Sequence, residues 1–420
     1  MNKMIMLLLS ALLLLTSCSS AGSADTASSA MSYKERAEAA GKLDSRLARQ
    51  SNELGLRLFS QLRAQDGGGG NLTISPYSIS AALALAYNGS KGDTAAELGK
   101  LLGYAPGELK KLNAAQAALL PLLNDVGSGI ELEMASSVWT DQGLPLRKDY
   151  LNRSKTYYDA EIKTTDLNAE KSVTKINQWA SDHTAGKIDR MIEQPPGPQA
   201  VAVLLNALYF KGEWTEKFPL ELSKPADFHV DKDISVQVLL MKQSGLFAYA
   251  ENEEWQAIRL PYGEGQMDMM VILPAEQSSL EQVLDQLSQM GLPAEEQFTE
   301  RGGAISLPRF TASYGTELKE AVQALGVQLA FDPNKGNFSA LADTGTSIFI
   351  SSIIHKTYIN VNESGTEAAA STAVKMLAGG AASAEVPFEM TVNRPFLFII
   401  EDRQTGVWLF MGAIENPLTE

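Results

Sequence analysis

The chain has 420 residues, of which 45% are hydrophobic and 20% are charged. This composition is typical of a globular protein with enough apolar material for a large core. The formal net charge of −15 argues against nucleic acid or another polyanion as a binding partner.

The first residues are typical of an export signal. Lys3 is followed by an apolar run over residues 5–15, which is too short to span a membrane as a mature helix. The run ends in Leu-Thr-Ser-Cys and resembles the lipobox of bacterial lipoproteins, where the cysteine is alkylated by diacylglycerol and the chain is cut just before it. We therefore expect residues 1–17 to be a signal peptide and Cys18 to carry a lipid, with a plain secretory signal as the alternative.

Cys18 is the single cysteine of the chain, so no intrachain disulfide is expected in the exported protein. Acyl chains on Cys18 would anchor the protein to a membrane, on the extracellular side of the cell envelope. The Ser- and Ala-rich residues 18–45 are expected to form a flexible tether. Residues 46–420 show no second linker and are expected to form one domain, acting as a monomer.

Helical patterns dominate the first half of this domain, and strand patterns dominate the second half. The first predicted helix begins at residue 51 and stops at the glycines 67–70, and the others cover residues 78–88, 93–102, 109–124, 147–157 and 170–184. The predicted strands cover residues 71–76, 201–210, 236–241, 256–260, 267–273, 305–311, 353–361, 386–392, 395–401 and 407–413. Because helices and strands do not alternate, the sequence predicts an α+β fold with mainly antiparallel sheets.

The sequence offers little for catalysis or metal binding. Its three histidines, His183, His229 and His355, lack the spacing of metal ligands, so neither a metal nor a cofactor is expected. The nucleophile-elbow and phosphate-loop motifs are missing from the sequence. His355 with Ser75 or Ser78 would suggest nucleophilic catalysis, but His355 lies in an apolar strand, where a buried, hydrogen-bonded histidine is the better interpretation. We therefore expect no enzymatic activity.

The segment 363–380 has an unusual alternation. Every second residue from Thr366 to Ala378 is apolar or carries a hydroxyl group, whereas the intervening set contains Glu367 and Lys375. This is the period of a strand with one face on a core. The small, Ala-rich composition equally suits an exposed helix or a solvated linker. A segment that can enter a sheet without being committed to it suggests a conformational switch.

Seven segments occur in the order and spacing of one protein family. They are residues 71–80, 203–214, 307–310, 354–356, 363–370, 393–398 and 410–412. In these segments, and from about residue 50 to the C-terminus, the chain resembles a serpin. The resemblance implies a serpin-like α+β fold, with helices packed on mainly antiparallel sheets and an exposed reactive loop at about residues 363–386.

The resemblance also implies a function. In this family a protease attacks the reactive loop and forms an acyl-enzyme, and the cut loop then inserts into the main sheet and traps the protease. The implied partner is a serine protease, or a papain-like cysteine protease, which also forms an acyl-enzyme. The alternative is a non-inhibitory serpin that acts as a binding or storage protein, although such members usually break the small-residue hinge pattern kept here.

The resemblance assigns roles to three groups of residues. The hinge of the loop comprises Glu363, Gly365, Thr366, Glu367, Ala368, Ala369 and Ala370. The polar cluster beneath the sheet, through which the strands part, comprises Ser75, Ser78, Asn206 and His355. Trp214 and Arg309 resemble the site where insertion starts, and Arg309 is expected to pair with Glu363.

The bond that the protease cuts is less well defined. Family spacing from Glu363 places it at Gly379-Gly380, with Ala378-Gly379 and Ala381-Ala382 as rivals. All candidates are small, which favours an elastase-like protease with a shallow pocket. A trypsin-like cut after Lys375 would leave only about ten residues to insert.

Overall fold

The computed structural model describes residues 31–65, 67–197, 200–345, 347–366 and 386–419. All of them belong to one compact unit, Met31–Glu420. The expected signal peptide and Cys18 lie outside the described residues. Within these residues, none of the helices is both long and apolar enough to cross a membrane.

Nine α-helices and three short 3₁₀ turns are described. The α-helices are α1 (Tyr33–Ala40), α2 (Arg46–Gln65), α3 (Pro76–Gly89), α4 (Gly92–Leu101), α5 (Leu109–Asn124), α6 (Lys148–Tyr158), α7 (Glu170–Asp182), α8 (Leu280–Met290) and α9 (Lys319–Ala324). The 3₁₀ turns are η1 (Leu220–Leu222), η2 (Glu295–Gln297) and η3 (Leu329–Phe331). Helix α3 is buried along its whole length, and Ser75 caps it by accepting a hydrogen bond from the Ser78 N–H.

The strands form two sheets. The six-stranded sheet has the order β10 (Phe310–Glu317), β11 (Ile350–Asn362), β12 (Gly365–Thr366), β4 (Ala202–Glu213), β2 (Ile130–Asp141) and β3 (Glu161–Thr165). The nine-stranded sheet has the order β1 (Leu72–Ile74), β15 (Val407–Ile414), β14 (Phe396–Asp402), β8 (Met267–Pro274), β7 (Trp255–Tyr262), β6 (Ser235–Glu251), β9 (Thr299–Pro308) and β13 (Phe388–Thr391), with β5 (Lys224–His229) paired to β6. Most pairs are antiparallel, which confirms the predicted α+β class.

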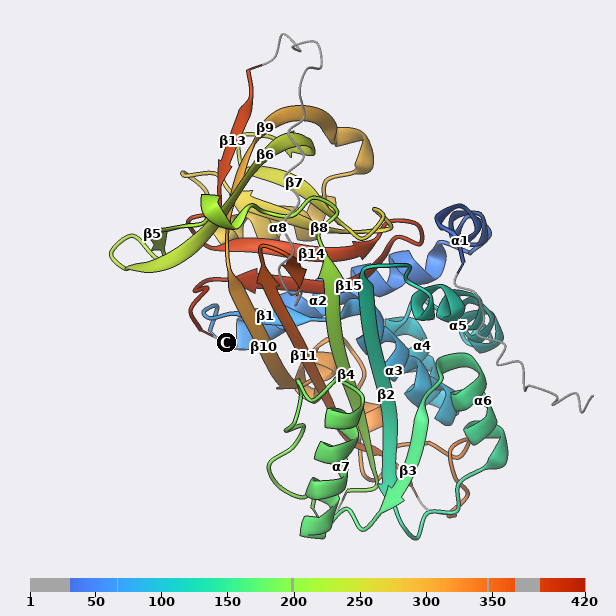
Figure 1. The fold of residues 1–420 in the computed structure, drawn as a ribbon. Coiled ribbons are helices and arrows are strands. Elements are labelled where there is room, and N and C mark those ends of the chain that lie inside the picture. Colours follow the sequence, from blue (N-terminus) through green and yellow to red (C-terminus); the bar gives the residue numbers. More distant parts are fainter. Residues whose placement is uncertain (1–30, 66, 198–199, 346, 367–385, 420) are drawn as a thin grey trace, which may run out of the picture. The chain divides into compact units, whose positions relative to one another are not determined.

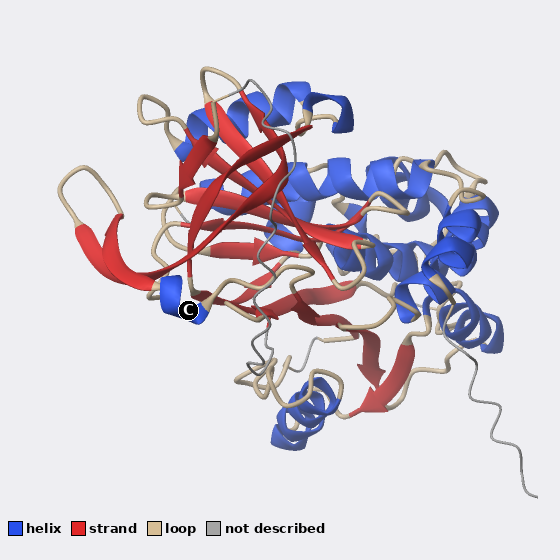
Figure 2. Cartoon of the chain, turned by 45° about the horizontal axis from the view of Figure 1, so that its top comes forward, coloured by secondary structure: helices blue, strands red, loops and turns tan. Residues whose placement is uncertain are grey.

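The six-stranded sheet is covered on both faces. Figure 1 shows α7 in front of this sheet and α3 behind it. Along β4, Leu204 and Leu208 pack into the main core, whereas Val203, Leu205 and Ala207 belong to a second core that includes residues of α7. Burial on both faces explains the continuous apolar run at residues 201–210. In the nine-stranded sheet, the β5–β6 hairpin projects beyond the other strands (Figure 2).

Two expectations from the sequence are corrected here. The predicted strand 305–311 is two strands in two different sheets, because β9 ends at Pro308 and β10 begins at Phe310. The expected tether does not extend to residue 45, because α1 begins at Tyr33 and is capped by Ser32. The Ser- and Ala-rich composition of this segment gave no sign that one of its residues, Arg36, is buried.

Arg36 fixes α1 to the rest of the fold through a buried ion pair. Its side chain is 1% exposed, and its Nη2 atom lies 2.5 Å from Oδ2 of Asp402, which is fully buried. Arg36 also donates to the backbone oxygens of Leu122 and Asp125 and to Oε1 of Gln404. All of these partners lie far from Arg36 in the sequence.

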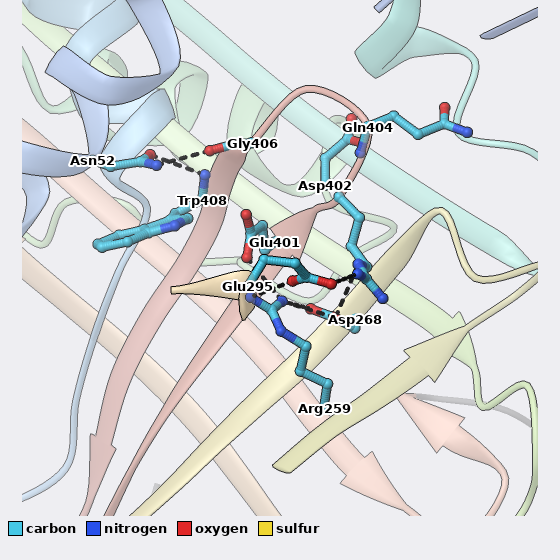
Figure 3. Close-up of polar contacts among 10 residues, drawn as sticks. Asn52, Arg259, Asp268, Glu295, Glu401, Asp402, Gln404, Gly406 and Trp408 are labelled. Carbon is cyan, nitrogen blue, oxygen red and sulfur yellow. Dashed lines mark hydrogen bonds and ion pairs between the residues drawn. The ribbon is translucent and has the colours of Figure 1, made fainter. Parts of the chain in front are cut away.

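The end of β14 carries charged contacts on both faces. Asp402 pairs with Arg36, while Glu401 on the opposite face accepts a hydrogen bond from Nη1 of Arg259 at 3.0 Å. Figure 3 shows Arg259 also in contact with Asp268, at 2.9 Å. Burial raises the pKa of Asp268 to about 6 and raises that of Glu401, against the attraction of Arg259. Asp268 therefore lowers the stability of the fold progressively as the pH rises from about 3.8 to about 6, and Glu401 acts in the same direction.

The Arg36–Asp402 pair predicts a large stability effect. Arg36→Met would leave Asp402 buried without a cationic partner and lower the free energy of unfolding by about 3–5 kcal/mol, measured by urea denaturation. Lys34→Met is the matched control, because Lys34 lies on the same helix with its side chain 86% exposed and should change stability by less than about 0.5 kcal/mol. Equal effects of the two substitutions would show that α1 is not anchored through Arg36.

Candidate functional site at the opening of the six-stranded sheet

In the six-stranded sheet, β4 and β11 are bonded directly to each other over most of their length, and they are separated by β12 at one end. Strands β4 and β11 pair in parallel from Ala202 opposite Ile350 to Tyr209 opposite Tyr358. Beyond that point, the short strand β12 lies between them and is antiparallel to both. Thr366 is opposite Val361 on β11 and Gly212 on β4.

The position of β12 depends on Gly365. This residue has φ of 137°, and a Cβ atom there would lie 2.0 Å from the carbonyl oxygen of Gly212. Only glycine fits such a backbone next to another strand. The following residue, Thr366, is fully buried, and its Oγ1 atom lies 3.0 Å from the hydroxyl oxygen of Tyr262.

Trp214 holds the turn before β12 in place. Its backbone N–H donates to the carbonyl oxygen of Ser364 at 3.1 Å, and its Nε1 donates to that of Asn362 at 2.9 Å. The indole also stacks on Tyr262, with ring centroids 4.2 Å apart. Trp214 therefore holds Asn362 and Ser364 of the turn, and Tyr262, which stacks on it, holds Thr366.

Arg309 and Glu363 form an ion pair at the start of this turn. The Nε and Nη2 atoms of Arg309 each lie 2.5 Å from one carboxylate oxygen of Glu363. The Ser223 hydroxyl donates to the same carboxylate at 2.5 Å. Burial opposes ionisation of Glu363, but these hydrogen bonds outweigh it and lower the pKa of Glu363. Bidentate pairing fixes the orientation of the carboxylate as well as its charge.

A buried polar cluster lies midway along the closed part of the sheet. His355 on β11 is directly opposite Asn206 on β4, and the His355 Nδ1 atom lies 2.7 Å from Asn206 Oδ1. The Asn206 side-chain amide donates to the hydroxyl oxygens of Ser78 at 2.6 Å and of Ser136 at 3.0 Å. The backbone N–H of Ser75 donates to His355 Nε2 at 3.0 Å. One continuous network thus joins β4, β11, β2 and the start of α3.

The hydrogen bonds define the protonation of His355. Because Nε2 accepts a hydrogen bond from the Ser75 backbone, the proton lies on Nδ1 and is donated to Asn206. Burial lowers the pKa of His355 to about 3. Neither ring nitrogen is bonded to a serine hydroxyl, as nucleophilic catalysis by Ser75 or Ser78 would require.

The structure brings together the residues that the resemblance grouped, and it adds three. Ser75, Ser78, Asn206 and His355 form one network, and Trp214, Arg309 and Glu363 surround the turn before β12. The sequence reasoning did not identify Ser136, Ser223 or Tyr262, which come from segments outside the quoted motifs. Ser136 lies in β2, whose first residues, Ile-Glu-Leu-Glu-Met at 130–134, alternate apolar and acidic side chains and are a local signal for a strand there.

The described residues do not include several that the sequence singled out. Glu367, Ala368, Ala369, Ala370 and the candidate bond residues Ala378, Gly379, Gly380, Ala381 and Ala382 fall outside the described residues. His183 contacts Glu161 at 2.8 Å, and His229 contacts the Ser235 hydroxyl at 2.8 Å. Among the described residues, His, Cys, Asp and Glu do not form a group of three or more that would hold a metal ion.

Comparison with known proteins identifies similar chains. A family model described as Serpin (serine protease inhibitor) matches residues 49–417. An uncharacterized serpin-like protein of Thermococcus kodakarensis is 32% identical over 362 residues, covering 86% of this chain and 84% of that protein. Leukocyte elastase inhibitor of Homo sapiens is 31% identical over 388 residues, covering 88% of this chain and 99% of the inhibitor. The crystal structure of Serpin48 from the insect Tenebrio molitor has a TM-score of 0.80 at 26% identity, covering 89% of this chain and 98% of that chain.

The buried His355 predicts a pH dependence of stability. The folded protein binds a proton at His355 less readily than the unfolded chain does, since the pKa is lowered from 6.5 to about 3. The stability that neutral His355 contributes is therefore complete above pH 6.5 and is lost as the pH falls toward 3, by up to about 1.4 kcal/mol per pH unit.

This dependence is measured by urea denaturation between pH 4 and pH 8 for the natural chain and for His355→Gln. The loss of stability below pH 6.5 should be shallower in the variant. Asp268 and Glu401 act in the opposite direction, but they are present in both proteins and cancel in the difference. Parallel curves for the two proteins would contradict a neutral, buried His355.

Proposed function

The chain belongs to the serpin family, and we propose that it inhibits an elastase-like serine protease by inserting its cleaved reactive loop into the six-stranded sheet. A papain-like cysteine protease is a further target of the same chemistry, because it also forms an acyl-enzyme. In this proposal the protein acts as a monomer without a cofactor, and its partner is the protease that it traps.

The observation that carries this proposal is the register of β12. Thr366 already lies between Val361 of β11 and Gly212 of β4. If the chain continues in that register, Ala370 reaches the pair Thr357–Leu208 and Thr372 reaches the pair His355–Asn206. These are the residue pairs through which β4 and β11 are now bonded directly. Insertion would therefore replace one parallel ladder with two antiparallel ladders. β4 and β11 would move apart sideways, but neither would slide along its own direction.

The alternation of residues 366–372 fits this register. The Thr366 side chain is buried, as are those of Ile359, Thr357 and His355 on β11. Ala368, Ala370 and Thr372 would face the same side, and all of them are small. A charged residue there would be buried without a partner and would cost several kcal/mol, on the order of the cost of a broken buried ion pair.

The opposite face of the inserting strand accepts charge. In the same register, Glu367 would lie opposite Lys211 of β4, whose side chain is 41% exposed. A cross-strand pair of opposite charge stabilises a sheet by about 0.2–1 kcal/mol. The charge pattern of the hinge therefore agrees with insertion in this direction and not with a strand rotated by one residue.

The polar cluster supplies a partner for the entering strand. Thr372 would pass between His355 and Asn206, whose side chains are now 2.7 Å apart. Its hydroxyl group can donate and accept, so it can satisfy both groups after they separate. The network therefore closes the sheet before cleavage and is suited to bond the new strand afterwards.

The elastase-like preference rests on the sequence of the loop and on one relative. The candidate bonds Gly379-Gly380, Ala378-Gly379 and Ala381-Ala382 all present small side chains, which suit a shallow pocket. Leukocyte elastase inhibitor is among the similar proteins. We further propose that lipid on Cys18 anchors the inhibitor on the extracellular side of the cell envelope.

Trapping is tested by incubation with pancreatic elastase, followed by denaturing gel electrophoresis and mass spectrometry. We expect an adduct that resists heat and SDS, together with a released C-terminal peptide that begins at Gly380. A peptide that begins at Gly379 or Ala382 would select one of the rival bonds. Complete cleavage without an adduct would mean that the protein is a substrate and not an inhibitor.

The register predicts a difference between two neighbouring positions. Thr366→Arg places a charge on the buried face, so insertion should stall and inhibition should change to turnover of the inhibitor. Glu367→Arg is the matched control, because it introduces the same side chain on the face that accepts charge, and most of its adduct should remain. The measurement is the number of inhibitor molecules consumed per protease molecule inactivated. Unchanged trapping by Thr366→Arg would exclude insertion in this register.

A further inference from the structure

A hollow of about 580 Å³ lies beside the turn that precedes β12. It is bounded by the start of β10, the end of β11, Leu220 of η1 and residues 417–419 near the C-terminus. This volume falls within the range of about 300–1,000 Å³ that is usual for small-molecule sites. The insertion mechanism uses the side chains of Arg309 and Glu363 from its lining, and it gives no role to Leu220 or Leu418.

The two charges in this hollow belong to one ion pair, of which the arginine is the exposed partner. Arg309 and Glu363 are the two charged residues that line it. The carboxylate of Glu363 is 3% exposed and already accepts hydrogen bonds from Arg309 and Ser223. By contrast, the Arg309 side chain is 42% exposed, and among the described residues its Nη1 atom has no hydrogen-bond partner. Among the described residues, the lining of the hollow therefore offers a guanidinium N–H and no free carboxylate.

Two exposed leucines flank the same hollow. Leu418 is 60% exposed and Leu220 is 45% exposed, and both rank among the large hydrophobic residues that face solvent. Exposed leucines at a hollow offer apolar surface that a ligand removes from water when it binds. The lining also contains the neutral polar residues Thr311, Asn360, Asn362, Ser364 and Thr419. An apolar surface beside one available cation is complementary to an amphipathic anion.

We propose that this hollow binds a small amphipathic carboxylate, whose anionic head pairs with Arg309 and whose apolar body covers Leu220 and Leu418. The net charge of −15 does not exclude such a ligand, because charges farther away than about 8–10 Å are largely screened at physiological salt. The site does not require that the protein inhibit a protease. It does require Arg309 to be shared with Glu363, so ligand binding and the hinge ion pair are coupled.

The test uses isothermal titration calorimetry of the full chain with decanoate as the probe and decanol as its neutral counterpart. Decanoate should bind at least about tenfold more tightly than decanol, because the carboxylate adds a charge-assisted contact with Arg309. Equal affinities, or no detectable binding of decanoate, would overturn the proposal.

Three variants locate the binding. Leu418→Ser should weaken decanoate binding severalfold, whereas Leu222→Ser should not, since Leu222 is 43% exposed on the same short helix as Leu220 but does not line the hollow. Arg309→Gln combined with Glu363→Gln removes both charges without leaving either one buried alone, and it should reduce the preference for decanoate over decanol to near unity. Equal weakening by Leu418→Ser and Leu222→Ser, or a preference that persists in the double variant, would show that decanoate binds elsewhere.

Discussion

The fold depends on the line of hydrogen bonds between β4 and β11. Along this line the two parallel strands bond directly, and at its end β12 lies between them. Because β12 already pairs with both neighbours, the two strands are spaced for a third strand at that point. The remaining ladder keeps the sheet closed, and its residue pairs coincide with the positions that a continued β12 would occupy. The same constraint therefore stabilises the closed sheet and defines the path by which it would open.

The surroundings limit how that opening can proceed. The Arg309–Glu363 pair and the Gly365 backbone fix where the chain enters the sheet. On one face of the sheet, the His355–Asn206 bond lies in the path of the strand. On the other face, Lys356 of β11 donates to the carbonyl oxygen of Arg190, which follows α7. An entering strand must separate His355 from Asn206, and the Lys356–Arg190 contact ties β11 to the segment after α7, so a barrier to spontaneous insertion is expected before cleavage.

Local sequence patterns predicted both continuously buried elements, such as β4, and half-buried ones, such as α5 and β11. The resemblance predicted the groups around β12. The apolar run 201–210 indicated β4 correctly because that strand is buried on both faces. Strand β2 was missed although its first residues alternate apolar and acidic side chains, as expected of a strand with one exposed face. Helix α1 was missed because its anchor, Asp402, is distant in the sequence. Ser223 and Tyr262 could not be assigned to the site from the sequence, because they reach it only through tertiary contacts. The cut bond could not be located from the sequence, because residues 379–384 are all small.

The most direct test of this account locks β4 to β11. Ala207 and Lys356 are opposite each other on the two strands, and neighbouring strands are close enough for a disulfide. In the double variant Ala207→Cys with Lys356→Cys, the oxidised protein should be cut by elastase without forming an adduct, and reduction should restore the adduct. Ala207→Cys alone should trap the protease under both conditions. Full trapping by the oxidised double variant would contradict the claim that the loop inserts between these two strands.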